Sequence, residues 1–395
     1  MRSVSLLLLP LVLAASGCSQ RVTPFGPGYI VNPNEDERRL WETSVADSEA
    51  IKASGKLYRD AELETYLNSV LERLLGEHRK AYLPLRPRVY ILDSPTVNAF
   101  AWPHGDIYVH TGLLGRIRNE AQLTMLLGHE LTHGTHRHAH QRLKHAYASS
   151  GANAYIGVLA ALGGGNIQRL VAGLSKLMTL ASISGYGRDK EEEADNVGLT
   201  LMAQAGYDPH EGGKMFVRMR DATDSKDRGW NFFYATHPKM KNRVKSCKKL
   251  VAQMPPELLA EAKVTGVERY LDVALRLVHE EVERHIVQGK FELAGETLDF
   301  LRDARPQDAK THAYRGELCR ARGNEGDSDQ ARQAYETALK LDPREPLALR
   351  GLGLLCLRLG DEQNAIRYLQ AYLAEAGDAV DARFIAQTIE RLKGE

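Results

Sequence analysis

Residues 128–141 read GHELTHGTHRHAHQ and hold five histidines and one glutamate. In the pattern His129-Glu130-x-x-His133, two imidazoles stand one helical turn apart on one face. Both can reach one zinc ion, while Glu130 projects beside the metal. Zinc lowers the pKa of water, and a nearby carboxylate can take the proton during attack on a peptide carbonyl. The spacing predicts metal-assisted hydrolysis, with His129 and His133 as ligands and Glu130 as general base.

The other three histidines of this stretch are expected to be polar helix surface or supporting groups. His136 and His140 continue the face of His129, a turn or more beyond the metal, and so lie too far away to close around it. His138 is given the same interpretation. A metzincin would need a third histidine at position 139, which is Ala139, so that class is excluded.

A downstream carboxylate run offers the third ligand. The segment GYGRDKEEEADNVG contains Glu191, Glu192, Glu193 and Asp195. Glu191 and Asp195 are four residues apart on one helix face, so one could bind zinc while the other accepts a hydrogen bond from a ligating histidine. Glu192 is expected to face solvent. Spacing alone does not distinguish Glu191 from Glu193 as the ligand.

These motifs together resemble a known family. HExxH followed about sixty residues later by E-x-E-A-D resembles the gluzincin metallopeptidases that include the CAAX prenyl proteases, the HtpX proteases and the BepA-type proteases. NAFAWPHGDIYVHTGLL (98–114), Tyr186-x-Arg188 and THPKMKNR (236–243) agree with the same family, over about residues 40–250. His104 and Gly187 stand where the family usually has glycine and serine. Because of His104, the resemblance does not predict the details of the substrate groove.

The resemblance implies roles for particular residues. Glu191 would be the third ligand of one Zn²⁺ per chain, and Asp195 would hold a ligating histidine. Asn98, Ala99 and Phe100 would lie by the edge strand that binds substrate. The attached repeats place the chain nearest to the BepA-like branch.

A histidine and an arginine further along the chain are also candidates. Pro238 keeps His237 out of a helix. A neutral imidazole there could occupy the fourth zinc position in the resting enzyme or donate a hydrogen bond to the oxyanion. Arg243 could steady the carboxylates or the same oxyanion. Both roles of His237 stay open.

The N-terminus is typical of an exported lipoprotein. Arg2 precedes the apolar run Leu6–Ala15, which is too short to span a membrane. Residues 1–17 are therefore a signal peptide, and LAASGC resembles a lipobox that would lipidate Cys18. Ser19 in the next position implies the outer membrane, facing the periplasm. Residues 18–36 are expected to be a lipidated tether; a soluble periplasmic protein is the alternative.

The whole-chain composition sets wider limits. With 395 residues there is room for two domains, and 52 basic against 51 acidic residues give no reason to expect nucleic acid as a partner. Cys247, Cys319 and Cys356 have no CxxC spacing, so we expect free or buried thiols, with one disulfide possible in an oxidising periplasm.

The C-terminal third is repetitive. Gly326 and Gly360 are 34 residues apart, as are Ala331 and Ala365, and an earlier copy starts at Gly289. This period is typical of the tetratricopeptide repeat, with small residues where its two helices cross. Three copies are near the minimum for a stable stack.

The predicted fold class is α+β, mainly α. Residues 37–255 would form a zincin-like zinc metallopeptidase domain, and residues 266–395 an all-α tetratricopeptide-repeat solenoid. The first would contain two or three short strands, a long helix over 119–146, a buried helix pair over 151–185, and a helix that carries the carboxylates and ends at Gly206.

The expected function is a zinc-dependent endopeptidase of the bacterial envelope, in quality control or assembly of outer-membrane proteins. Its substrates would be unfolded or misassembled envelope proteins, and the repeats could contact the assembly machinery. The membrane would be reached by the lipid anchor only. The alternative is a lipoprotein chaperone or adaptor that acts through its repeats with little proteolysis.

Overall fold

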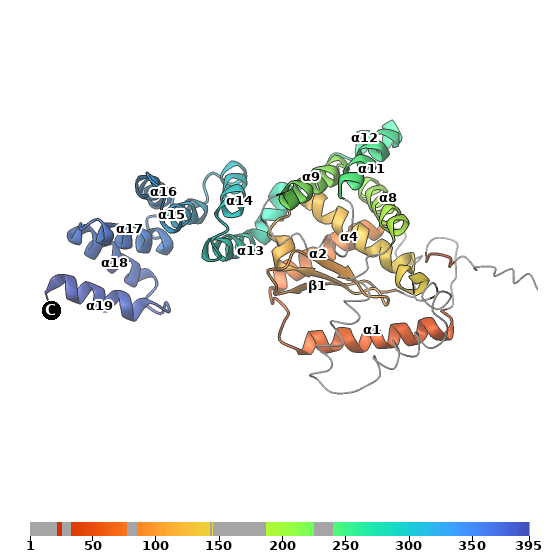
Figure 1. The fold of residues 1–395 in the computed structure, drawn as a ribbon, viewed down its shortest axis with the longest axis horizontal. Helices are drawn as coiled ribbons and strands as arrows, with labels where there is room; N and C mark the ends of the chain where they lie inside the picture. Colours follow the sequence, from red (N-terminus) through yellow and green to blue (C-terminus); the bar gives the residue numbers. More distant parts are fainter. Residues whose placement is uncertain are drawn as a thin grey trace, which may run out of the picture.

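The computed structural model describes residues 22–25, 33–76, 85–142, 144, 187–224 and 240–394 (Figure 1). The predicted signal peptide, Cys18, the helix pair of residues 151–185 and His237 lie outside these residues. None of the described helices is long and apolar enough to cross a bilayer.

A small sheet forms the floor of the first domain. Its strands β1 (Val89–Leu92), β2 (Ala99–Ala101) and β3 (Ile107–His110) are ordered β1-β3-β2. β3 runs parallel to β1 and antiparallel to β2. Strand β2 therefore lies at the edge, paired with β3 on one side within the described residues. The prediction of two or three short strands is confirmed.

Helices cover both faces of the sheet (Figure 1). On one face, α2 (Ala61–Leu75) and α4 (Glu120–Thr135) share a hydrophobic core with β1 and β3. On the other face lies α1 (Glu35–Ala53), where the Ser48 hydroxyl donates to Asp106 Oδ2 at 2.7 Å. The short α3 (Thr111–Leu114) follows β3 directly.

The described residues of this domain also form α8 (Arg188–Gln204), α9 (His210–Asp224), α11 (Met240–Gln253) and α12 (Pro256–Glu261). The carboxylate-bearing helix α8 stops just before Gly206, as expected. That glycine adopts a φ of 84°, a left-handed conformation that glycine reaches without a steric cost.

The predicted continuous helix over residues 119–146 is wrong. α4 ends at Thr135, and Arg137 has a φ of 59° before helical structure resumes at His138. A non-glycine residue in the left-handed region redirects the chain. His138 therefore does not continue the face that the uninterrupted pattern implied.

The repeat region is a series of helix pairs: α13 (Val267–Val287) and α14 (Phe291–Ala304), α15 (Ala309–Arg322) and α16 (Asp327–Leu341), and α17 (Pro346–Arg358) and α18 (Glu362–Glu375). A final helix, α19 (Ala382–Lys393), follows. The three glycines that mark the period lie one or two residues before α14, α16 and α18, with φ of 71°, 79° and 77° (Gly289, Gly326 and Gly360). The predicted mainly helical α+β fold with repeats is confirmed.

Close helix crossing explains the small residues of the repeats. Ala294, Ala331 and Ala365 are each 0% exposed. A Cβ on Gly316 or Gly351 would come within 2.4 Å of the Tyr335 ring. The close packing of the stack therefore requires glycine, which has no side chain, at Gly316 and Gly351.

Helix α13 belongs to two cores. Tyr270, Leu271, Ala274, Leu277 and Val278 lie in the core that includes α2 and α4. The Tyr270 hydroxyl donates to the carbonyl of Leu114 at 2.6 Å. Farther along the same helix, Val282 and Ile286 pack with α14 and α15. The first repeat helix is therefore built into the first domain.

Candidate metal centre

The HExxH motif lies in a helix that is buried along its whole length. Asn119 caps α4, its side chain accepting from the Gln122 amide, and every residue of the helix from Glu120 to Thr135 is buried. His129 and His133 are each 2% exposed, and Glu130 is 1% exposed. The helix position is therefore well determined before any metal is considered.

Two glycines let the second helix approach. A Cβ on Gly128 would stand 3.0 Å from Gly198 Cα, and one on Gly198 would stand 2.9 Å from the His129 amide nitrogen. Helices α4 and α8 thus cross with their backbones almost in contact. This close crossing carries Glu191 to the histidines.

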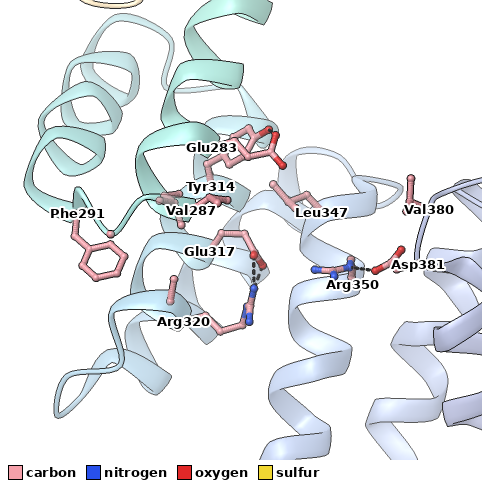
Figure 2. Close-up of a pocket in the computed structure, with 13 residues that line it drawn as sticks. Glu283, Val287, Phe291, Tyr314, Glu317, Arg320, Leu347, Arg350, Val380 and Asp381 are labelled. Carbon is pink, nitrogen blue, oxygen red and sulfur yellow. Dashed lines mark hydrogen bonds and ion pairs between the residues drawn. The ribbon is translucent and has the colours of Figure 1, made fainter. Parts of the chain in front are cut away.

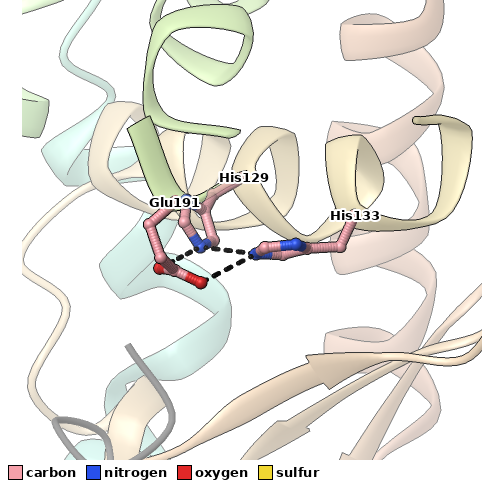
Figure 3. Close-up of side chains that lie close together, drawn as sticks. All are labelled: His129, His133 and Glu191. Atoms are coloured by element: carbon pink, nitrogen blue, oxygen red, sulfur yellow. Dashed lines mark hydrogen bonds and ion pairs between the residues drawn. The ribbon is translucent and has the colours of Figure 1, made fainter. Parts of the chain in front are cut away.

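Three side chains converge on one point (Figure 3). The Nε2 atoms of His129 and His133 are 3.1 Å apart. The carboxylate of Glu191 lies 3.6 Å from the first and 3.5 Å from the second. One ligand atom from each residue falls within 4.8 Å of the others. Two imidazoles and a carboxylate match the donor set of a catalytic zinc site with three protein ligands.

The carboxylate of Asp195 holds His129 from behind. Asp195 Oδ1 lies 3.0 Å from His129 Nδ1, so the ring donates there and turns Nε2 toward the other ligands. Arg243, on α11, donates its Nε to Asp195 Oδ2 at 2.7 Å and its Nη2 to Oδ1 at 2.5 Å. The sequence left two roles open for Arg243, at the carboxylates or at the oxyanion. In the structure its guanidinium contacts the carboxylate of Asp195.

Charge in this buried cluster is balanced by the arginine. Burial alone would raise the pKa of Asp195, but Arg243 and His129 lower that pKa to about 2. Burial would lower the pKa of Arg243, whereas Asp195, Glu191 and Glu130 raise it. Arg243 also stacks over the Phe216 ring at 4.3 Å. Asp195 and Arg243 are thus both ionised at neutral pH.

A second chain of contacts supports His133. Its Nδ1 lies 2.8 Å from His138 Nδ1, and His138 Nε2 lies 3.3 Å from Glu193 Oε2. With Nε2 of His133 aimed at the metal position, Nδ1–H donates to His138, which in turn donates to Glu193. Lys190 Nζ adds an ion pair to the same carboxylate at 2.9 Å. The sequence left His138 undecided and missed Glu193 in this position.

The left-handed residue Arg137 creates that second chain. Its guanidinium binds both carboxylate oxygens of Glu37 in α1 and donates to the Thr23 carbonyl at 3.0 Å. Phe25, 2% exposed, donates its amide to the Thr135 carbonyl at 2.7 Å. Residues 22–25, expected in the tether, therefore pack on the end of α4. The sequence gives no signal for this turn, because arginine is not a residue type that favours a positive φ.

The remaining candidate residues are more dispersed. Glu192 is exposed, as expected, and His140 is 4% exposed away from the three ligands. Asn98 is 0% exposed and directly precedes β2, which carries Ala99 and Phe100. The Phe100 ring stacks on the ring of Tyr108, its partner on β3, with centroids 5.3 Å apart. Because this side chain lies on a face of the sheet, the backbone of β2 is the part of the segment that faces the sheet edge.

The repeats contain a large groove (Figure 2). It encloses about 740 Å³, and four of its charged side chains form two ion pairs, Arg320 with Glu317 and Arg350 with Asp381, while the fifth, Glu283, accepts a hydrogen bond from the Tyr314 hydroxyl at 3.1 Å. Apolar side chains lie between these pairs; Val287 is 81% exposed, and Phe291 and Leu347 also line the groove.

A helix-borne HExxH joined by a carboxylate from a second helix defines the metallopeptidases of the gluzincin class. Residues 61–251 match peptidase family M48, and residues 320–390 match the tetratricopeptide repeat. The chain therefore carries an M48 peptidase domain followed by tetratricopeptide repeats, which confirms the resemblance seen in its motifs.

Relatives of this chain include proteases named for beta-barrel assembly and a mitochondrial metalloendopeptidase. It is 26% identical to the beta-barrel assembly-enhancing protease of Yersinia pestis over 54% of this chain and 44% of that protein. The protein of the same name from Escherichia coli K12 is 24% identical, over 55% and 46%. The mitochondrial metalloendopeptidase OMA1 of Schizosaccharomyces pombe is 30% identical, over 46% and 50%. The chain thus spans about half the length of these relatives or less.

Among solved structures, a match to a chain of the TPR2AB-domain:pHSP90-complex of yeast Sti1 extends over 69% of this chain and 97% of the other. The match has a TM-score of 0.25 at 12% identity, which is too low to indicate a shared fold.

Proposed function

We propose that this protein is a zinc-dependent endopeptidase. The observation that carries the proposal is that Glu191 of α8 converges within 4.8 Å on His129 and His133 of α4, the buried helix that also bears Glu130. When bound there, zinc would polarise the scissile carbonyl and acidify water. Softer metals prefer thiolates, and Mg²⁺ and Ca²⁺ prefer all-oxygen sites, so two imidazoles with one carboxylate favour zinc.

Each protein group would have its own role in hydrolysis. His129, His133 and Glu191 would hold the metal, and Glu130 would take the proton of the attacking water and deliver it to the leaving amine. Asp195 fixes the ring of His129, and Arg243 keeps Asp195 ionised. His237, in the segment outside the described residues, remains a candidate for a latch on the metal or a donor to the oxyanion.

An extended substrate would bind along β2. Residues Ala99–Ala101 pair with β3 through one edge, and a peptide added at the other edge would gain main-chain hydrogen bonds. Asn98, Ala99 and Phe100 would then line the substrate strand. Recognition through main-chain atoms suits a protease that acts on many unfolded sequences.

The setting we propose is the bacterial envelope, at the outer membrane. Support comes from the signal-like N-terminus, from Cys18 in its lipobox-like context, and from relatives named beta-barrel assembly-enhancing protease. Substrates would be unfolded or misassembled outer-membrane proteins. The groove of the repeats has apolar side chains between two ion pairs, with Glu283 as one acidic side chain in excess, and so suits a substrate segment or an assembly partner without strong net charge.

A chaperone or adaptor role through the same groove is the second candidate. The groove favours it, but the arrangement of Glu130 beside the histidines does not, because a purely structural zinc requires no base.

Replacing Glu130 with Gln separates the two functions. We expect casein cleavage by purified protein to fall roughly 100-fold or more, because the general base is lost. Zinc content should stay at one per chain, since Glu130 is not a ligand. Glu192→Gln, an exposed glutamate on α8, is the matched control and should keep full activity. Undiminished cleavage by Glu130→Gln would reject the peptidase mechanism.

Metal analysis tests the ligand set. Alanine in place of His129, His133 or Glu191 should abolish zinc binding. Full zinc occupancy in Glu191→Ala would instead move the third ligand to Glu193, the alternative that spacing left open.

A further inference from the structure

A small cavity lies where the first domain meets the repeats. It encloses about 40 Å³ and is lined by Arg116 and Arg118 from the segment between α3 and α4, Arg218 from α9, His285 from α13, and Glu296 and Thr297 from α14. Four separate parts of the chain meet here. The unusual feature is that three of these side chains are arginines.

Two of the arginines have only neutral hydrogen-bond partners. Arg118 Nη2 donates to Thr297 Oγ1 at 3.2 Å, and its Nη1 is buried without a hydrogen-bond partner among the described residues. Arg218 Nη2 donates to Gln122 Oε1 at 2.5 Å. Within the described part of the chain, no carboxylate forms an ion pair with either guanidinium.

Nearby carboxylates are committed elsewhere or lie at the rim. Glu211 accepts from Lys214 at 2.5 Å, and Glu281 is ion-paired with Arg284. Glu296 is exposed and forms no ion pair with a described residue, although its charge attracts both guanidinium groups, as that of Glu211 attracts Arg218. The cavity lining still holds three arginines against one carboxylate, an excess of positive charge.

Arg118 and Arg218 are both partly buried, and charges withdrawn from water are normally paired, because an uncompensated charge there is costly. Burial, and then repulsion from Arg218, lower the pKa of Arg118 to about 9, and burial lowers the pKa of Arg218 as well. A cavity of this size admits a water molecule or a small ion. Water would accept hydrogen bonds but would leave the charge excess unchanged, whereas an anion would correct both.

We propose that this cavity binds one small inorganic anion, a chloride or a phosphate-type oxyanion, held by Arg118 and Arg218 between the first domain and α14. Because Arg118 also reaches Thr297 and stacks over Phe300 at 4.7 Å, the bound anion would strengthen the junction between peptidase and repeats. This site does not depend on the proposed peptidase activity.

Anion-dependent thermal unfolding of the full chain is the test. In gluconate buffer at constant ionic strength, replacing gluconate by chloride or, separately, by phosphate should raise Tm saturably, by roughly 2 °C or more, because a ligand of the folded state stabilises it by mass action. The two titrations show which anion is preferred. Chlorine NMR line broadening measures chloride binding directly.

Charge variants give the discriminating signature. Arg118→Gln and Arg218→Gln should each remove the anion dependence of Tm, because each substitution removes one of the two guanidinium groups that hold the anion. Glu296→Gln should lower the half-saturating anion concentration several-fold. Arg302→Gln, an exposed arginine of α14 paired with Asp299, is the control and should respond like the unsubstituted chain.

Either of two results would overturn the site. One is a Tm that does not change saturably with either anion. The other is a rise that persists in both Arg118→Gln and Arg218→Gln, which would identify a general salt effect. If one variant fails to fold, the other variant and the NMR measurement still decide.

Discussion

At the scale of single residues, the two imidazoles that we propose as metal ligands are held in different ways. His129 donates to an ionised, fully buried carboxylate that an arginine also holds, whereas His133 contacts a neutral imidazole. Burial, the largest cause, lowers the pKa of His138 to about 4, so this ring is neutral and can accept from His133 Nδ1–H. Its other nitrogen passes the orientation on to Glu193.

This second support should be measurable as metal affinity. We expect His138→Phe to weaken zinc binding by about 10- to 100-fold, the usual effect of removing a hydrogen-bond partner from a ligating histidine. His138→Gln, which can still accept from His133, should recover part of that loss. Chelator competition followed by circular dichroism would measure the affinity and check the fold. Equal affinities in His138→Phe and the unsubstituted chain would show that His138 only fills space.

At the scale of elements, the crossing of α4 and α8 sets the distance between the histidines and Glu191. The crossing is close because neither Gly128 nor Gly198 carries a Cβ. The strand β3 presents a different kind of constraint. It ends in His110, 5% exposed, whose burial lowers the pKa to about 4.

Gly198→Ala should separate the two helices. The new Cβ would meet the His129 amide nitrogen at 2.9 Å, a backbone contact that can be relieved only by moving a helix. We expect about 1–3 kcal/mol lower stability, as for other overpacked cores, together with weaker zinc binding. The control is Gly295→Ala in α14, where the nearest atom is 3.8 Å away. If Gly198→Ala has the same free energy of unfolding and the same zinc affinity as the unsubstituted chain, the close crossing is contradicted.

His110 predicts a pH dependence of stability. In the unfolded chain the imidazole takes up a proton below its ordinary pKa of 6.5, while in the folded chain it does so only below about 4. The folded state therefore loses stability as pH falls from 6.5 to 4, by roughly 3 kcal/mol from this group.

Replacement by leucine checks this dependence. The free energy of unfolding of His110→Leu should fall less steeply with pH over that interval than that of the unsubstituted chain. Both should be measured with a chelator present, because zinc binding has a pH dependence of its own. Parallel curves would show that His110 does not contribute.

At the scale of the whole molecule, the two domains are joined by a shared helix and not by a linker. The first half of α13 completes the core of the peptidase domain, and its second half begins the repeat stack. Figure 1 shows the repeats continuing from this helix away from the peptidase domain, to the C-terminus at the far end. Leu301 of α14 also reaches the first core.

Truncation should therefore depend on where it is made. A chain ending at residue 265 would lack the five side chains of α13 that lie in the peptidase core, and the apolar surface they cover would be exposed. This chain should fail to fold. A chain ending after residue 306 keeps α13 and α14 and should retain zinc and peptide hydrolysis, while losing the groove of the later repeats. Soluble yield and casein cleavage distinguish the two. A stable, active chain ending at 265 would show that α13 is dispensable to the peptidase core.

The sequence alone predicted most of the features that depend on patterns along the chain. The helical spacing of His129 and His133, the 34-residue repeat with its glycines, and the family resemblance were all visible in the order of residues. Helix geometry is local, so the positions of side chains on one face follow directly from their separation. The same reasoning failed after Thr135, because it assumed that the helix continued.

Only the tertiary structure decided how separate elements meet. It places Glu191 beside the two histidines and Glu193 beside His138, although both glutamates lie on one helix two residues apart. The outcome depends on how α8 crosses α4 and on the left-handed turn at Arg137, which contacts with Glu37 and Thr23 hold in place. Such contacts join residues about 100 positions apart, and no local pattern specifies them. The arginine-lined cavity has the same origin: its charge excess exists only because four distant segments pack together.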